Sequence, residues 1–366
     1  LLKRVIAGHW GLVPKLQKLA LTGKIEAYNF PQGVITHLYR DIAGHLPRTI
    51  THVGLGTFVD PRLSGGKVND ITREDLVELI HFDDREYLAY KTLPIHVALL
   101  RGTTADMDGN ITMEKEAFTL EVLPLAMAAK NSGGFVIVQV ERIAERGALN
   151  ARHVEIPGML VDCVVVSRPE NYWQTYGTYY NPAYSCEFKV PTTGIEPLML
   201  DERKIIARRA AFELQPNMVV NLGIGMPEGV ANVANEEGIF DYLTLTAEAG
   251  SIGGIPSGGQ DFGTATNMDC LIDMHLQFDF YDGGGLDLAC LGLAQMDAAG
   301  NVNVSKFGPK LAGCGGFIDI TQNAKKMVFA GTFMAGVTEL AIEDGRLRVV
   351  KEGGLKKIVH GVEQIR

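Results

Sequence analysis

The chain has 366 residues, of which 46% are hydrophobic and 21% charged, so it has the composition of a globular protein rather than a disordered one and is long enough for two domains. Its formal net charge is −9 and no basic run exceeds two residues, which argues against a nucleic-acid-binding protein. No stretch of 18 apolar residues is present, so the sequence predicts no membrane-spanning helix.

Three short segments of the first half recur in the second half, in the same order and at nearly the same separation. They are 30–34 (FPQGV) with 226–230 (MPEGV), 51–54 (THVG) with 247–250 (AEAG), and 108–111 (DGNI) with 299–302 (AGNV). The separation is too long for a solenoid repeat and indicates one duplicated domain. The expected joint is the Pro- and Thr-containing stretch 191–197, which divides the chain into an N-terminal half, 1–192, and a C-terminal half, 193–366.

The second half opens with a predicted helix and a predicted strand. Residues 201–214 carry apolar residues at helical spacing, and Asp201 is a suitable N-cap for them. Residues 218–222 (MVVNL) are a short apolar run, typical of a buried strand. The glycine-containing loop 223–227 (GIGMP) follows this strand directly.

A further helix and strand follow the loop. Pro227 suits the first position of a helix over 227–237, and Gly238 suits its C-terminal cap. Residues 242–246 (YLTLT) alternate in polarity, which predicts a strand. Strand, helix and strand in this order predict a parallel pair with a right-handed crossover. The predicted fold class is therefore α/β, with two similar open α/β domains and mostly parallel sheets.

The spacing of these elements brings a carboxylate to the edge where open α/β folds bind ligands. The loop 223–227 follows the first strand and Glu248 follows the second, and the carboxyl ends of parallel strands share one edge. A helix start offers free N–H groups that can hold a phosphate, a carboxylate or a developing oxyanion. We therefore expect Glu248 to lie beside such a start.

Three interpretations of this edge are open from the residues alone. A glycine-rich turn with an acid roughly 20 positions later is typical of nicotinamide dinucleotide sites, but Glu228 stands where the third glycine of that motif belongs. Alternatively, Glu248 is a nucleophile, because a carboxylate is ionised near neutrality and needs no general base. The glycines of 250–259 would leave room for a bulky acyl group. The plainest interpretation is an exposed acid among turns.

The sequence lacks the motifs of several other kinds of site. The chain has no G-x-S-x-G elbow and no H-E-x-x-H, and its nine histidines show no metal-ligand spacing, so we expect no metal. The five cysteines form no C-x-x-C pair, which favours free thiols in a reducing cytoplasm. The aromatic segment 172–180 could in principle stack on bases, but a domain-packing or subunit interface is the better prediction for an acidic chain.

Four segments of the second half resemble the pattern of family I coenzyme A transferases. They are 223–227 (GIGMP), 246–250 (TAEAG), 300–305 (GNVNVS) and 313–320 (GCGGFIDI). Residues 52–62 (HVGLGTFVDPR) resemble the acetate/propionate branch, whose members exchange CoA between acetyl-, propionyl- or acetoacetyl-CoA and short-chain acids. The resemblance covers essentially the whole chain. It implies two similar α/β halves, CoA as a substrate rather than a prosthetic group, no metal, and a cytoplasmic homo-oligomer, either dimer or tetramer.

The resemblance also implies roles for individual residues. Glu248 would attack the acyl-CoA carbonyl and displace CoA thiolate, and the thiolate would then attack the resulting anhydride to leave a glutamyl-CoA thioester. Residues expected to contact substrate or CoA are Gly223, Ile224, Gly225, Met226, Pro227, Asn301, Asn303, Gly315 and Gly316. Asn301 and Asn303 fit equally well as turn residues of a hairpin. Ala249 departs from the family, which often has Asn or Ser after the glutamate.

Two other classes of function remain as alternatives to a transferase. One is the nicotinamide oxidoreductase described above, and the other is a binding protein or sensor that kept the fold without its chemistry. Fused family members are longer than this chain, and the chain begins at Leu1 rather than Met, so we expect segments to be missing at both ends.

Overall fold

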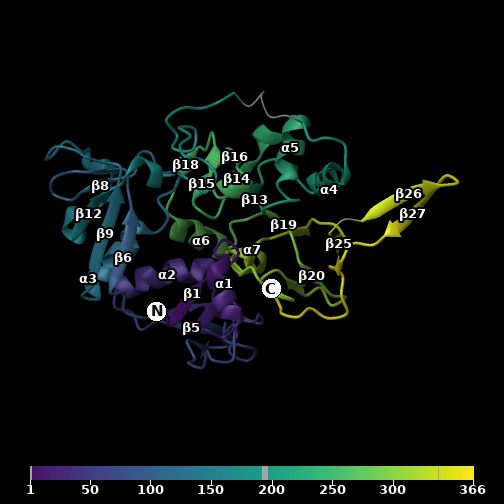
Figure 1. Ribbon diagram of the computed structural model, residues 1–366, viewed down its shortest axis with the longest axis horizontal. Helices are drawn as coiled ribbons and strands as arrows, with labels where there is room; N and C mark the ends of the chain where they lie inside the picture. The colour runs from purple at the N-terminus through teal and green to yellow at the C-terminus, as the bar shows by residue number, and fades with distance from the viewer. Residues whose placement is uncertain (1, 192–196, 337) are drawn as a thin grey trace.

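The computed structural model describes residues 2–191, 197–336 and 338–366 (Figure 1). The predicted boundary between residues 192 and 193 lies outside the described residues, so the division into two domains stays a prediction. In Figure 1, helices α2 (Gln32–Ala43), α6 (Met274–Asp282) and α7 (Phe317–Asn323) lie together at the centre of the molecule. Helix α6 contacts both α2 and α7, so these three helices join the N-terminal part of the chain to the C-terminal part.

The first half contains a parallel sheet and an antiparallel sheet. The parallel sheet has the order β12-β9-β6, and its buried alternate residues pack against α3 (Val122–Asn131). The antiparallel sheet has the order β3-β5-β4. The remaining helix is α1 (Pro14–Leu21), and the strands are β1 (Arg4–Ala7), β2 (Glu26–Asn29), β3 (Arg48–Thr51), β4 (Val77–Phe82), β5 (Arg85–Lys91), β6 (Val97–Arg101), β7 (Thr104–Ala105), β8 (Ile111–Thr112), β9 (Phe135–Val140), β10 (Arg142–Ile143), β11 (Val154–Ile156) and β12 (Cys163–Val166).

The second half is built on a six-stranded sheet of order β18-β15-β14-β13-β19-β24. Strands β14, β13, β19 and β24 pair in parallel, whereas β15 pairs antiparallel with both of its neighbours, β14 and β18. The remaining helices are α4 (Glu202–Ala211) and α5 (Gly229–Glu236), and the sheet strands are β13 (Val219–Leu222), β14 (Thr244–Thr246), β15 (Ser251–Ile252), β18 (Cys270–Leu271), β19 (Leu288–Leu291) and β24 (Met327–Phe329). The predicted α/β class with mostly parallel central sheets is thus confirmed.

Short antiparallel pairs surround this sheet. The hairpin of β26 (Glu339–Glu343) and β27 (Arg346–Lys351) extends away from the body in Figure 1. The other short strands are β16 (Ile255–Pro256), β17 (Ala265–Thr266), β20 (Gln295–Met296), β21 (Val302–Asn303), β22 (Lys306–Phe307), β23 (Lys310–Leu311), β25 (Met334–Ala335) and β28 (Leu355–Lys356). In the described part of the chain no helix is long and apolar enough to cross a membrane.

The strand–helix–strand unit of the second half forms largely as predicted. The Asp201 side chain accepts a hydrogen bond from the Lys204 N–H at 3.0 Å and caps α4. The prediction that a helix begins at Pro227 is wrong, because α5 begins at Gly229. Residues 226–231 instead make backbone bonds between positions three apart, such as Val230 N–H to Pro227 C=O at 3.0 Å, and this tighter winding delays the α-helix.

Two turns in the repeated segments have the same pattern of hydrogen bonds. Asp106 accepts bonds from the backbone and side-chain N–H groups of Asn110, each at 2.9 Å. Asp297 accepts the same two bonds from Asn301, each at 3.0 Å. The intervening glycine has φ +83° at position 109 and +82° at position 300, a conformation that favours glycine. The sequence repeat of 108–111 and 299–302 therefore corresponds to a repeated turn.

The two halves share a core and interlock through their backbones. The largest buried cluster contains Phe30 and Val34 from the first half and Cys314 and Ile318 from the second. The Gln32 N–H donates to the carbonyl of Gly315 at 2.8 Å, and residues 8–11 bond to residues 312–315. The first half therefore holds the segment that leads into α7.

Candidate active site

Glu248 occupies the tip of a tight turn between β14 and β15. The Gly250 N–H donates to the Ala247 carbonyl at 3.1 Å, and the Ala247 N–H donates to the Ser251 carbonyl at 3.0 Å. This turn keeps the glutamate next to the carboxyl end of a parallel strand, as the spacing predicts. The Glu248 residue is half-buried rather than exposed, so the interpretation as an ordinary surface acid is wrong.

Gly316, at the start of α7, lies directly against the Glu248 carboxyl group. A Cβ atom built on Gly316 would come within 2.5 Å of Glu248 Oε2, so only glycine permits this approach. Burial raises the pKa of Glu248 to about 7, while the backbone N–H of Gly316 opposes the shift. The expectation of a fully ionised carboxylate at neutrality therefore needs correction, because a pKa this high favours the protonated form of Glu248 more than an ordinary carboxyl group does.

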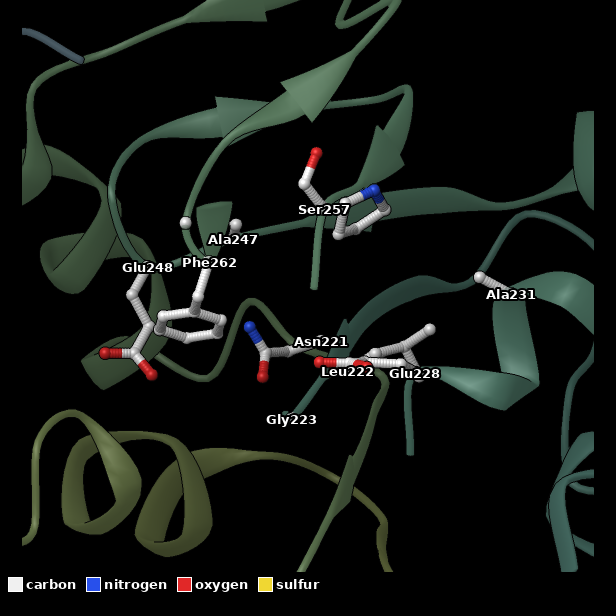
Figure 2. A pocket seen from close by; sticks show the side chains of 11 residues that line it. Asn221, Leu222, Gly223, Glu228, Ala231, Ala247, Glu248, Ser257 and Phe262 are labelled. Carbon is white, nitrogen blue, oxygen red and sulfur yellow. The ribbon is translucent and has the colours of Figure 1, made fainter. Parts of the chain in front are cut away.

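A narrow pocket opens beside Glu248 and has an interior of about 20 Å³, enough for about one water molecule. Figure 2 shows the ring of Phe262 next to the Glu248 side chain, with Asn221 and Glu228 lining the same pocket. The full lining is Asn221, Leu222, Gly223, Glu228, Ala231, Ala247, Glu248, Pro256, Ser257, Phe262 and Gly263. Phe262, Ser257 and Asn221 were not predicted as site residues from the sequence.

The predicted loop 223–227 reaches this pocket only at its first residue. Gly223 lines the pocket and is fixed there because its N–H donates to the Cys290 carbonyl at 2.8 Å. Ile224, Gly225, Met226 and Pro227 are not among the described residues that line it. Met226 instead packs against the core of the second half.

Asn301 lies in the turn before β21 and Asn303 lies on β21, and neither residue lines the Glu248 pocket. The Asn301 amide donates to Asp297 as described above. Asn303 is fully buried, and its amide donates to Gln295 Oε1 and to the Lys306 carbonyl, both at 2.8 Å. Both amide groups are thus engaged in local bonds, which agrees with the alternative of turn residues.

Three buried polar side chains form a hydrogen-bonded network next to the Glu248 turn. The Tyr281 hydroxyl donates to Thr246 Oγ1 at 2.9 Å and accepts from the Asn221 amide at 3.3 Å. The same amide donates to the Thr246 carbonyl at 3.2 Å. A polar Asn221 inside the apolar run 218–222 was the one signal in the sequence for this network.

A second buried carboxyl group, Asp319, lies one helical turn beyond Gly316. Asp319 is fully buried, and a Cβ atom on Gly33 would meet its Oδ1 atom at 2.3 Å. Burial raises the pKa of Asp319 well above its usual range, and the nearby Asp282 adds to the shift. Burial therefore favours the neutral form of Asp319. Among the described residues, no group of three His, Cys, Asp or Glu side chains could hold a metal ion.

The family model and two similar proteins agree on one family. The family model for coenzyme A transferases matches residues 1–167. The chain is 52% identical over 365 residues to the caffeate CoA-transferase of Acetobacterium woodii, covering 98% of this chain and 70% of that protein. It is 45% identical over 365 residues to the acetate CoA-transferase YdiF of Escherichia coli K12, covering 100% of this chain and 68% of that protein.

Solved structures agree with these relatives. The crystal structure of the acyl-CoA transferase YdiF apoenzyme from Escherichia coli O157:H7 matches with a TM-score of 0.91 and 44% identity, over 99% of this chain and 68% of that one. A thioester complex of that enzyme with CoA matches with a TM-score of 0.90 over the same shares of the two chains. The overall backbone of this chain is therefore similar to that of a protein that has been crystallised as a thioester complex with CoA.

Proposed function

The chain belongs to the coenzyme A transferases of family I, and on this premise we propose that it exchanges CoA between short-chain acyl-CoA thioesters and free acids of the acetate, propionate and acetoacetate type. The exchange is ping-pong and passes through a thioester on Glu248. Family membership decides against the nicotinamide oxidoreductase and the non-enzymatic sensor. The enzyme is proposed to be a cytoplasmic homo-oligomer.

The observation that carries this proposal is the Glu248 carboxyl group itself, half-buried at the strand edge against Gly316. In the first step the Glu248 carboxylate attacks the acyl-CoA carbonyl, and the C–S bond breaks to release CoA thiolate. The thiolate then attacks the glutamyl carbonyl of the mixed anhydride, which releases the first acid as a carboxylate and leaves glutamyl-CoA. The acceptor acid reverses these steps, so no net proton or electron is exchanged with solvent.

The remaining predicted residues take supporting roles in the proposal. The backbone N–H of Gly316 stabilises the oxyanion that forms on the glutamyl or acyl carbonyl. The N–H of Gly315 donates to the Gly8 carbonyl at 2.8 Å, so Gly315 contributes to the wall of the site without donating to the oxyanion. Gly223 shapes the pocket, and Ile224, Gly225 and Pro227 contact CoA outside it, while Met226 anchors the loop to the core. Asn301 and Asn303 act by holding their turns.

A mass measurement tests the covalent step. Acetyl-CoA alone should add CoA to the protein, because the first half-reaction needs no acceptor, and peptide mapping should place the adduct on Glu248. The variant Glu248→Gln should form no adduct and lose activity by about 10³-fold or more, because an amide is not a nucleophile. Glu237→Gln, at the exposed end of α5, is the matched control and should form the adduct normally. An adduct on Glu228, the other carboxylate of the pocket, would contradict the assignment.

The two similar enzymes named above differ in the acid that they use, because one is a caffeate and the other an acetate CoA-transferase. An aryl-substituted acid is therefore a second candidate substrate, and the higher identity to the caffeate enzyme favours testing it. Propionyl-CoA with a panel of acceptor acids, followed by mass detection of new acyl-CoA species, separates the two candidates.

A further inference from the structure

A second cavity of about 430 Å³ lies next to the Glu248 pocket and has aromatic walls. Its rings come from Phe118, Trp173 and Tyr176 of the first half and Phe262 of the second. The volume falls within the range of small-molecule binding sites. The Glu248 pocket alone is too small for an acyl group larger than a few atoms.

Phe262 connects this aromatic cavity to the Glu248 pocket, because its side chain lines both. In Figure 2 its ring lies beside the Glu248 side chain. Phe118 closes the same boundary, since its ring would come within 3.3 Å of a Cβ on Gly263, and Gly263 lines the Glu248 pocket. The two cavities therefore meet at Phe262, and Phe118 and Gly263 lie at the same boundary.

The aromatic walls are held in place from both halves of the chain. Asp261, next to Phe262, accepts hydrogen bonds from the hydroxyl groups of Thr178 at 2.9 Å and Tyr184 at 3.3 Å, and also from Thr175. The loop that carries Trp173 and Tyr176 is therefore tied to the loop that carries Phe262. The aromatic segment 172–180, predicted to form a domain-packing or subunit interface, thus contacts the loop of the second half that carries Phe262.

Two rings that line the cavity are exposed to solvent, and its charged lining residue, Arg101, is paired with a carboxylate. Trp173 is 47% exposed and Tyr176 72% exposed, so neither ring is buried in the core. The Arg101 guanidinium pairs with Glu116 at 2.8 Å and stacks on the Tyr172 ring at 3.9 Å. The cavity therefore favours an uncharged flat ring over a phosphate group or a second carboxylate.

We propose that the aromatic cavity binds the ring of an aryl-substituted carboxylic acid while the acid's carboxylate reaches Glu248. This inference rests on the proposed function, since it names the substrate class of the same site. The acid's carboxylate attacks glutamyl-CoA, the C–S bond breaks, and the released thiolate attacks the acyl carbonyl of the anhydride to give aryl-acyl-CoA and free Glu248. The ring takes no part in the bond changes and contributes binding by stacking.

The test compares acceptor acids with propionyl-CoA as the donor. Wild type should use 3-phenylpropanoate as well as acetate. In the double variant Trp173→Ala, Tyr176→Ala, the ratio of kcat/KM for 3-phenylpropanoate over acetate should fall by about tenfold or more. Tyr242→Ala removes a ring that is 60% exposed and lines neither cavity, and it should leave this ratio unchanged.

Fluorescence gives a readout of binding that is independent of turnover. Of the two tryptophans, Trp10 is fully buried and Trp173 is half-exposed in the cavity. Addition of 3-phenylpropanoate should change the emission of wild type, whereas acetate should not. The variant Trp173→Phe should lose the change and keep the preference for 3-phenylpropanoate.

The outcomes separate this inference from the proposed function. If wild type transfers CoA to acetate but does not use 3-phenylpropanoate, or if the double variant leaves the ratio unchanged, the inference is overturned and the proposed function stands. A rise in the KM of propionyl-CoA with every acceptor would also overturn it, because the rings would then bind the adenine of CoA. If no acid is used and no CoA adduct forms on Glu248, the proposed function fails, and the emission change alone decides whether the cavity binds an aryl ring.

Discussion

Burial of the Glu248 carboxyl group has opposite effects on how much nucleophile is present and on how reactive it is. A pKa of about 7 leaves only part of the enzyme in the ionised form at neutral pH. A carboxylate with a higher pKa is also a more basic and hence a stronger nucleophile. The residue could be predicted from its place after a parallel strand, but its protonation could not, because the carboxyl group packs against residues such as Gly316 that are distant in sequence.

The raised pKa predicts the pH dependence of the first half-reaction. Only ionised Glu248 attacks the thioester, so kcat/KM for acyl-CoA should rise with pH through about 7 and level off above it. For a carboxyl group with an ordinary pKa the rise would be centred near 4.5, the usual value. Rates measured from pH 5 to pH 9, with the thioester's own hydrolysis subtracted, distinguish the two cases. A flat profile over that range would contradict a buried carboxylate.

The close contact of Gly316 with Glu248 predicts a large effect of one added methyl group. In Gly316→Ala the Cβ would lie 2.5 Å from Glu248 Oε2 and 2.9 Å from the Phe278 ring, so the carboxyl group must move. We expect kcat to fall by about 10²-fold, in line with the sensitivity of covalent catalysis to misplacement of a reacting group. Gly361→Ala, where a Cβ meets nothing within 4 Å, is the control. Equal rates for the two variants would show that the contact has no part in catalysis.

At the scale of elements, local signals explain which predictions succeed. Apolar runs and turn residues located β13, β14 and the capped helix α4 within a few residues. The start of α5 was misplaced because Pro227 is acceptable both in a helical first turn and in the tighter turn that the backbone bonds of 226–231 select. The role of Tyr281 was invisible in sequence, since a buried aromatic residue on α6 is ordinarily read as core.

The bonds between Tyr281, Thr246 and Asn221 predict a role in stability. Tyr281→Phe keeps the buried ring but removes the hydroxyl, which leaves the Asn221 amide with one partner fewer. The free energy of unfolding should fall by about 1–2 kcal/mol. Urea denaturation measures this, and Tyr242→Phe, on an exposed ring, should change it by less than about 0.5 kcal/mol. A loss no greater than that of Tyr242→Phe would mean that the network contributes nothing to stability.

For the whole molecule, the sequence predicts a duplication, and the structure shows both a shared feature and a difference between the predicted halves. The repeated turns at 106–110 and 297–301 share their bonding. His52, which the repeat aligns with Glu248, instead has its Nε2 atom 2.7 Å from Asn323 Oδ1. Interlocking of the halves could not be predicted, because it depends on backbone contacts between residues 8–32 and 312–315 that leave no periodic signal.

The interlock predicts that a residue of the first half controls the site of the second. Asn29 is buried, its amide donates to the carbonyls of Ala7 at 2.9 Å and Gly8 at 2.8 Å, and its Oδ1 accepts from the Cys314 N–H at 3.0 Å. Cys314 lies two residues before Gly316, so loss of these bonds frees the wall that faces Glu248. Asn29→Ala should therefore lower both the free energy of unfolding, by about 2–3 kcal/mol, and kcat.

Asn69 provides the matched control for this prediction. Its amide also donates two bonds, to the carbonyls of Ala20 at 2.7 Å and Ile25 at 2.9 Å, but all three residues belong to the first half. Asn69→Ala should lower the free energy of unfolding without the fall in kcat, measured under conditions where both variants are folded. If kcat falls equally in the two variants, the effect of Asn29 is one of general stability. The first half would then not position Gly316 against Glu248.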